Sequence, residues 1–230
     1  MSLILSIETA TQVCSVALHQ AGKPVAHTTF FAHRSHAECL MVLIDNLLTT
    51  AGLNQKALAA VALSKGPGSY TGLRIGASVA KGLCYGLGIP LIGISTLAAM
   101  VEGMRVMVDA ATLLCPTIDA RRNAVYTLVA HATGQIERAT HVALLDQETY
   151  LQSMPNQPML FFGDGALKCK HWIGARDQIR FVAAGLPSAL HIGDLAFPMF
   201  QQAAWEKIEH YEPYYLSQFT SIEAKKQDHT

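Results

Sequence analysis

Hydrophobic residues in the first hundred positions alternate between short runs typical of strands and longer repeats at helical spacing. The strand-like runs occupy residues 3–7, 13–20, 25–31, 58–64 and 89–94. Helical repeats run from Ser35 to Gly52 and from Thr71 to Gly86, and Ser95 is placed to cap a third helix. The pattern therefore predicts three strands in a row, followed by helix, strand, helix, strand and helix.

The second half of the chain begins with the same layout. An apolar strand ends with an acidic residue at residues 117–119, as another does at residues 6–8. Each of these two strands is followed by a polar turn and a further strand. Further patterns predict a strand at residues 159–163 and helices at residues 164–172 and 188–205. Together they predict an α/β, actin-like (ASKHA) fold in which two ribonuclease H-like halves carry mixed sheets flanked by helices. The predicted parts are residues 1–104, residues 105–217 and a polar, mobile tail at residues 218–230.

Composition limits the classes of function. Half of the 230 residues are hydrophobic and only 15% are charged, below the usual quarter or so. Such a surface is expected to be covered in part by a partner. Lysine and arginine number 17, as do aspartate and glutamate. A protein that grips nucleic acid alone usually carries a basic stripe, so the neutral balance argues against that class.

Cysteine usage and the N-terminus bear on location. The five cysteines are scattered and include no C-x-x-C pair, which indicates free thiols in a reducing compartment. The N-terminus has no basic region of a signal peptide, and no apolar stretch approaches the roughly 18 residues of a membrane span. We therefore expect a cytoplasmic protein without membrane contact.

The strongest local motif is glycine-rich and runs from Lys65 to Gly76. Glycines allow close approach of the backbone, and a helix N-terminus attracts anions. The residues therefore fit either a phosphate-binding loop or a tight strand-to-helix turn. The motif is not a Walker A loop, because no Gly-Lys-Ser/Thr follows.

Small residues recur every four positions after this loop. They are Gly72, Gly76, Ala80, Cys84 and Gly88. On a helix they form a ridge that lets another backbone approach closely. The approaching backbone could belong to another protein or to the chain's own sheet, and spacing alone leaves both open.

Catalytic and metal-binding patterns are weak. His33 and His36 lie three apart, but Ser35 as the helix cap puts His33 outside the helix, and no acid stands at metal-site spacing. The sequence contains no G-x-S-x-G nucleophile elbow, and the cysteines have no evident histidine partner. We therefore predict neither a catalytic residue nor a metal site.

The segment G-P-G-S-Y-T-G-L-R-I-G from Gly66 closely resembles the signature of the TsaB family, also called YeaZ, which is related to glycoprotease-like (peptidase M22) proteins. Supporting segments are S-I-E-T-A-T-Q-V-C-S-V-A-L from Ser6, I-S-T-L from Ile94, I-D-A-R from Ile118, G-D-G-A from Gly163 and E-P-Y-Y-L from Glu212. The chain departs from the family at Glu8, where aspartate is usual. In actin-like ATPases this acid lies near the phosphates and their metal, so a longer side chain argues against ATP hydrolysis.

The resemblance implies a scaffold that is not itself an enzyme. It would pair with a TsaD-like catalytic subunit, which transfers the threonylcarbamoyl group to the adenosine next to the tRNA anticodon, and a TsaE-like ATPase would join them. ATP and metal would then serve the partner subunits, with no cofactor required by this chain. It would meet tRNA only through the complex and form a homodimer when alone.

The resemblance also assigns residues to two sites. The nucleotide-like cleft would comprise Glu8, Thr9, Gly66, Pro67, Gly68, Ser69 and Asp119. The interface would comprise His36, Leu40, Leu43, Leu47, Gly72, Leu73, Gly76, Ala80 and Leu83. Two alternatives stay open: a small actin-like ATPase or phosphotransferase that uses the cleft, and a metal-dependent peptidase, for which no ligand set is found.

Overall fold

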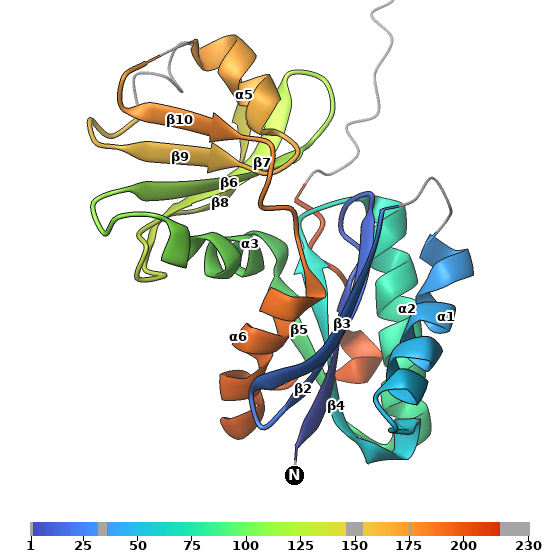
Figure 1. Cartoon of the computed structure of the whole chain (residues 1–230). Coiled ribbons are helices and arrows are strands. Elements are labelled where there is room, and N and C mark those ends of the chain that lie inside the picture. The colour runs from blue at the N-terminus through green and yellow to red at the C-terminus, as the bar shows by residue number, and fades with distance from the viewer. Residues whose placement is uncertain (1, 32–35, 146–153, 175, 217–230) are drawn as a thin grey trace, which may run out of the picture.

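The computed structural model describes residues 2–31, 36–145, 154–174 and 176–216. These residues form two halves, each built on a five-stranded mixed sheet with helices packed against it (Figure 1). None of the helices in these ranges combines the length and the apolar character needed to cross a membrane. The predicted tail and His33 lie outside the described residues.

The first sheet has the strand order β3-β2-β1-β4-β5. Its strands are β1 (Leu3–Glu8), β2 (Val13–Gln20), β3 (Lys23–Phe31), β4 (Leu58–Gly66) and β5 (Leu91–Ser95). The first three strands form an antiparallel meander, whereas β4 and β5 run parallel to β1. The predicted succession of strands and helices in this half is confirmed.

Alternation along β1 decides which helices cover each face of this sheet. Leu5 and Ile7 point into a core formed with α1 (His36–Thr50) and α2 (Tyr70–Leu87). Ile4 points to the opposite face, where it meets Ile192 of α6 (Ala189–Gln201). Because both faces are covered, β1 reads as a continuous apolar run in the sequence.

The second sheet has the strand order β10-β9-β6-β7-β8. Its strands are β6 (Leu113–Asp119), β7 (Ala124–Ala130), β8 (Ile136–Leu144), β9 (Met159–Phe162) and β10 (Ile179–Val182). Helix α5 (Ala166–Ile173) packs on one face through Cys169 and Ile173. Helix α3 (Thr96–Met104) packs on the other face through Leu97 and Met100. Because Ala99 of α3 also belongs to the core of the first half, this helix joins the two halves.

The last part of the chain returns to the first half. Helix α6 packs against the first sheet through Ile192 and Ala196, although it follows the whole second sheet in the sequence. Residues 205–216, which we call the C-terminal strap, also pack on the first half, where the backbone N–H of Glu206 donates to the carbonyl of Leu91 at the start of β5. The strap ends at Leu216, which packs against the core of the second half. The range 105–217 expected for the second half therefore includes segments that pack on the first.

Candidate functional site

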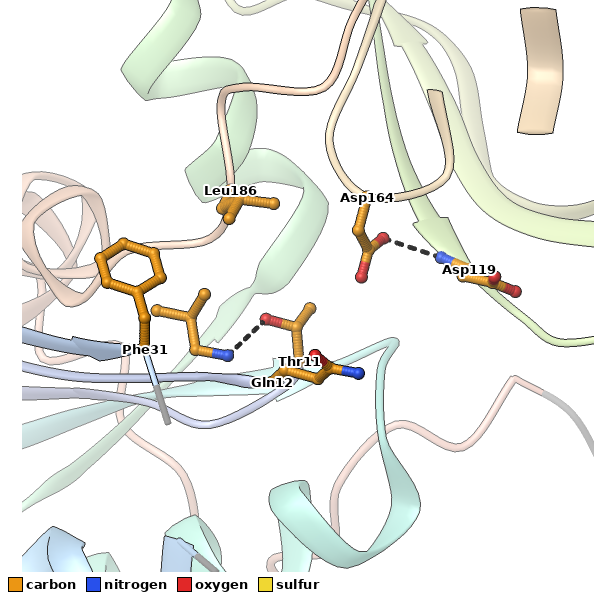
Figure 2. A pocket seen from close by; sticks show the side chains of 7 residues that line it. Thr11, Gln12, Phe31, Asp119, Asp164 and Leu186 are labelled. Atoms are coloured by element: carbon orange, nitrogen blue, oxygen red, sulfur yellow. Dashed lines mark hydrogen bonds between the residues drawn. The ribbon is translucent and has the colours of Figure 1, made fainter. Parts of the chain in front are cut away.

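A cavity of about 480 Å³ lies between the two halves (Figure 2). Its lining residues are Thr11, Gln12, Val13, Phe31, Asp119, Asp164 and Leu186. The first four come from the β1–β2 turn, the start of β2 and the end of β3. In the second half, Asp119 is the last residue of β6 and Asp164 follows β9. Residues far apart in the sequence thus meet at one opening.

Hydrogen bonds fix the two aspartates in this cavity. The Asp164 carboxylate accepts the backbone N–H of Asp119 at 2.9 Å (Figure 2). The Asp119 carboxylate accepts the backbone N–H of Arg121 at 2.6 Å and contacts the Lys168 ammonium of α5. Burial raises the pKa of Asp164, and the charge of Asp119 adds to that rise. Lys168 balances one of the two carboxylates, so the cavity keeps a net negative character.

Glu8 lies outside this cavity. Its side chain is 0% exposed, one carboxylate oxygen accepts the Ala10 N–H at 2.6 Å, and the other has no hydrogen-bond partner among the described residues. Burial raises the pKa of Glu8 to about 7, and hydrogen bonds from the backbone of Ala10 and from Ser64 oppose that rise. A carboxylate sealed in this way cannot reach a phosphate or metal in the cavity.

The glycine-rich loop is filled by the chain's own backbone. The Ser69 N–H donates to the Ala10 carbonyl at 2.6 Å, and a side chain at Gly68 would collide with the same residue. On the other side, the Tyr214 N–H donates to the Lys65 carbonyl at 2.6 Å. The structure thus favours the tight turn over the phosphate-binding loop, because the Ser69 N–H is used by the β1–β2 turn and the Lys65 carbonyl by the C-terminal strap.

Of the seven residues predicted for the nucleotide-like cleft, only Asp119 lines the cavity; Thr9 is buried beside α2. The lining residues Thr11, Gln12 and Asp164 were not predicted from the sequence. Asp164 could have been found, because it directly follows the predicted strand at residues 159–163, close to where Asp119 ends its own strand.

The ridge of small residues on α2 packs within the chain. Added side chains at Gly72 and Gly76 would collide with Thr9 at the end of β1, and Ala80 is buried in the first core. The predicted interface residues Leu40, Leu47, Leu73 and Leu83 are also buried, and Leu43 is partly buried against the same core. Within the chain these residues pack inward, and their predicted role in an interface with another protein stays a prediction.

His36, the remaining predicted interface residue, is partly buried and its Nε2 lies 2.7 Å from the Thr11 carbonyl. The contact ties the first turn of α1 to the β1–β2 turn. Within the described ranges no group of three or more histidine, cysteine, aspartate or glutamate side chains could hold a metal ion.

A different set of residues on the same two helices is exposed. On α1, Met41 and Val42 are 42% and 57% exposed, and on α2 Tyr85 is 86% exposed. Gly82 and Gly86 are exposed beside Tyr85, and a side chain added at either would meet nothing within 4 Å. We call these five residues the outer face of α1 and α2.

Comparisons with known proteins agree on one family. The family model "TsaD: tRNA N6-adenosine threonylcarbamoyltransferase" matches residues 30–221. The TsaB protein of Escherichia coli strain K12, named as a tRNA threonylcarbamoyladenosine biosynthesis protein, is 32% identical over 93% of this chain and 94% of its own length. The Bacillus subtilis TsaB protein is 32% identical over 70% of each chain.

Superpositions on solved structures identify the fold. YeaZ from Pseudomonas aeruginosa superposes with a TM-score of 0.77 and 26% identity, over 94% of this chain and 100% of its own. An inorganic polyphosphate/ATP-glucomannokinase from Arthrobacter sp. strain KM superposes with a TM-score of 0.51 at 11% identity, over 87% of this chain and 100% of its own, which confirms the actin-like fold alone.

The family model shares its name with longer transferases, but those relatives match only in part. A tRNA N6-adenosine threonylcarbamoyltransferase from Jannaschia sp. strain CCS1 is 43% identical over 29% of this chain and 19% of its own length. The TsaB relative from Escherichia coli instead matches from end to end. With the YeaZ superposition, this agreement over nearly the whole length shows that the chain belongs to the TsaB family.

Proposed function

We propose that this chain takes part in tRNA threonylcarbamoyladenosine biosynthesis as a non-catalytic subunit that binds a TsaD-like transferase. The observation that carries the proposal is the outer face of α1 and α2, which exposes Met41, Val42 and Tyr85 on a chain with few charged residues. Exposed apolar residues gathered on one surface are typical of protein interfaces. The relatives named TsaB and the match to the TsaD family model indicate the biosynthetic pathway.

The sealed cleft residues support a role without chemistry. Glu8 is fully buried, and the glycine-rich loop is occupied by Ala10 and Tyr214 of the same chain. Asp119 is engaged by Lys168. Neither the Glu8 carboxylate, which is buried, nor the Asp119 carboxylate, which is paired, is therefore free to act on a phosphate. In this proposal ATP and metal serve the partner subunits, a TsaE-like ATPase joins the complex, and tRNA is met only through it.

A reconstituted assay with a TsaD-like subunit tests this proposal. Val42→Glu places a charge on the outer face, and burying an unpaired charge there is expected to weaken partner affinity by about tenfold or more. Ile136→Glu is the matched control, because Ile136 is 46% exposed on β8 of the second half. We expect Val42→Glu to lower tRNA modification at limiting partner and the control to leave it unchanged. Equal activity of both variants would contradict the proposed interface.

An actin-like ATPase or phosphotransferase is the second candidate. The cavity between the halves favours it, since actin-like enzymes also work between two halves and two carboxylates line this one. Turnover of ATP by the purified chain, lost in Asp164→Asn, would establish it. The absence of turnover with the partner present would leave the subunit role as the sole candidate.

A further inference from the structure

Three histidines and one aspartate meet where α6 packs against the first sheet, outside the cavity between the halves. Asp194 of α6 lies between two of them: its Oδ1 is 3.3 Å from Nε2 of His19 in β2, and its Oδ2 is 3.2 Å from Nδ1 of His191 in α6. The third is His27 of β3, whose Nε2 lies 3.3 Å from the hydroxyl of Ser188, the residue that caps α6. Groups that can gain a proton near neutral pH thus connect β2, β3 and α6.

The backbone around this histidine cluster leaves room for two of its rings. A side chain added at Gly193 of α6 would collide with the His19 ring, and one added at Gly103 of α3 would collide with the His191 ring. His19 is 0% exposed, and its Nδ1 has no hydrogen-bond partner among the residues that the structure describes. The contact of α6 with its neighbours is therefore built around the two rings, and a change in their charge acts directly on the packing of α6.

Charged groups from the neighbouring elements do not offset the charge of this cluster. On α3, Arg105 and Glu102 form an ion pair with 2.9 Å between Nε and Oε2, so their charges cancel. At the start of β3, Lys23 stands opposite Gln20, and alternation turns both side chains away from the face that carries His19. The residues of β4 and β5 that pack on α6 are apolar.

Glu8 of β1 faces the same side of the sheet but is distant from the cluster. It lies four residues beyond the position of β1 that stands opposite His19, roughly 13 Å along the strand, which is too far for an ion pair. Asp194 can therefore balance one imidazolium, whereas a second or a third adds positive charge without a counterion. Protonation of the cluster should then weaken the contact of α6 with the sheet.

The titration of two members agrees with this direction. Burial acts to raise the pKa of Asp194, but the His19 and His191 side chains outweigh burial and hold that pKa well below its usual range. Partial burial lowers the pKa of His27, and the charges of His191 and His19 lower it further. The folded state thus binds a proton at His27 more weakly than the unfolded state does. The fold carries no penalty from His27 above its ordinary pKa of 6.5, and a penalty appears as pH falls below that value.

We propose that this histidine cluster makes the docking of α6 sensitive to protonation, so that α6 separates from the first sheet as the imidazoles gain charge. Separation would uncover Ile4 and its apolar neighbours, because α6 covers that face of the sheet. It would also move Leu186, which precedes α6 and lines the cavity between the halves. Helices α1 and α2 lie on the other side of the sheet (Figure 1), so the inference goes beyond the proposed function and does not depend on it.

Hydrogen–deuterium exchange of the full chain at pH 7.5 and pH 5.5, corrected for the intrinsic pH dependence of exchange, tests the proposal. We expect the amides of α6 to lose protection by about tenfold or more at the lower pH, while the amides of α2 keep theirs. Local exchange is the suitable measurement because protonation of the buried Glu8 stabilises the chain over the same range and would offset the effect in global denaturation. EDTA in every sample keeps metal ions from binding the histidines.

Three histidine variants identify the cause of the loss. His191→Gln keeps a hydrogen-bond donor for Asp194 but cannot take up a proton, so it should reduce the loss of protection. His27→Gln changes an exposed side chain without disturbing the core and should act in the same direction. His210→Gln is the matched control, because it replaces an exposed histidine of the C-terminal strap and should behave as the unmodified chain does.

Equal protection of α6 at both pH values would overturn the proposal. A loss as large in His191→Gln and His27→Gln as in the unmodified chain would do the same, because the imidazoles would then not cause it. A loss shared by α2 would mean that the first half unfolds as a whole, which also rejects a local release of α6. Asp194→Asn removes the carboxylate that balances the first imidazolium and should shift the release to higher pH; an unchanged pH dependence would contradict the role assigned to Asp194.

Discussion

At the scale of single residues, Glu8 shows how burial changes the role that a carboxylate can have. The sequence places it at a strand end, where an actin-like enzyme would hold metal or phosphate. The structure seals it, with one oxygen bonded to Ala10 and the other unpaired. Its position in the fold could be predicted from the strand pattern, but its exposure could not, because that depends on how the β1–β2 turn and Ser64 of β4 pack around its carboxyl group.

The buried carboxyl of Glu8 gives a pH-dependent prediction. Its pKa rises from an ordinary 4.5 to about 7, so the folded state binds the proton more tightly than the unfolded state does. Stability should therefore fall as pH rises from about 4.5 to about 7 and then level off, with a total loss of about 3 kcal/mol. Glu8→Gln removes this loss.

Urea denaturation at pH 5 and pH 8 measures the effect. Glu8→Gln should stabilise the chain at pH 8 by up to about 3 kcal/mol and have little effect at pH 5. The exposed Glu209→Gln serves as the control and should change stability equally at both values. Destabilisation of Glu8→Gln at pH 8 would mean that the carboxylate has a charged partner in the folded protein. In the tRNA modification assay, Glu8→Gln is expected to retain activity.

At the scale of elements, α2 carries two stripes of small residues, and the sequence cannot say which one meets the sheet. Gly72 and Gly76 belong to the inner stripe, whereas Ser78, Gly82 and Gly86 form the outer one. Both recur every four residues, so helical spacing alone assigns them equally well. Which stripe packs against the sheet depends on the position of Thr9, and that position is set by the tertiary structure. Strand β8 escaped prediction for a related reason: it is an exposed edge strand without a clear apolar alternation.

A glycine-to-leucine substitution should have opposite effects on stability in the two stripes. Gly76→Leu drives a side chain into Thr9 and should cost about 3 kcal/mol of stability through overpacking. Gly82→Leu extends into open space and should leave stability within about 0.5 kcal/mol. It should instead alter self-association of the homodimer that we expect through the outer face. Denaturation and analytical ultracentrifugation together decide this. Unchanged self-association in Gly82→Leu, with the fold intact, would place the dimer contact elsewhere.

At the scale of the whole molecule, the actin-like arrangement of two halves could be predicted from the repeated strand-and-acid pattern. The site between them could be predicted only in part, because its lining depends on how the halves are joined. Asp119 was predicted from the family resemblance and from its place at a strand end, whereas Phe31 and Leu186 lack any local signal of a site. The joining elements, α3 and α6, pack by apolar contacts that carry no information about a cavity.

The arrangement of the two halves predicts weak or absent nucleotide binding. The cavity keeps a net negative character, and the Ser69 N–H of the glycine-rich loop donates to the Ala10 carbonyl instead of to a ligand. Calorimetry of the purified chain with ATP and magnesium should therefore give little or no heat of binding, and no hydrolysis should follow. Tight, magnesium-dependent binding that is lost in Asp164→Asn would refute this expectation. Lys168→Ala, which frees the Asp119 carboxylate, is a useful companion variant because it should not create binding.

The return of α6 to the first sheet has a consequence for synthesis on the ribosome. The face of β1 that carries Ile4 is covered by Ile192 and Ala196, which emerge only after the entire second sheet. Domains usually complete in order from the N-terminus as they are made. Here the half that is made first must wait, with an apolar sheet face uncovered, until the last helix has left the exit tunnel. The second half, made later, can close first, so a nascent chain stalled before α6 would carry a finished second half and an open first one.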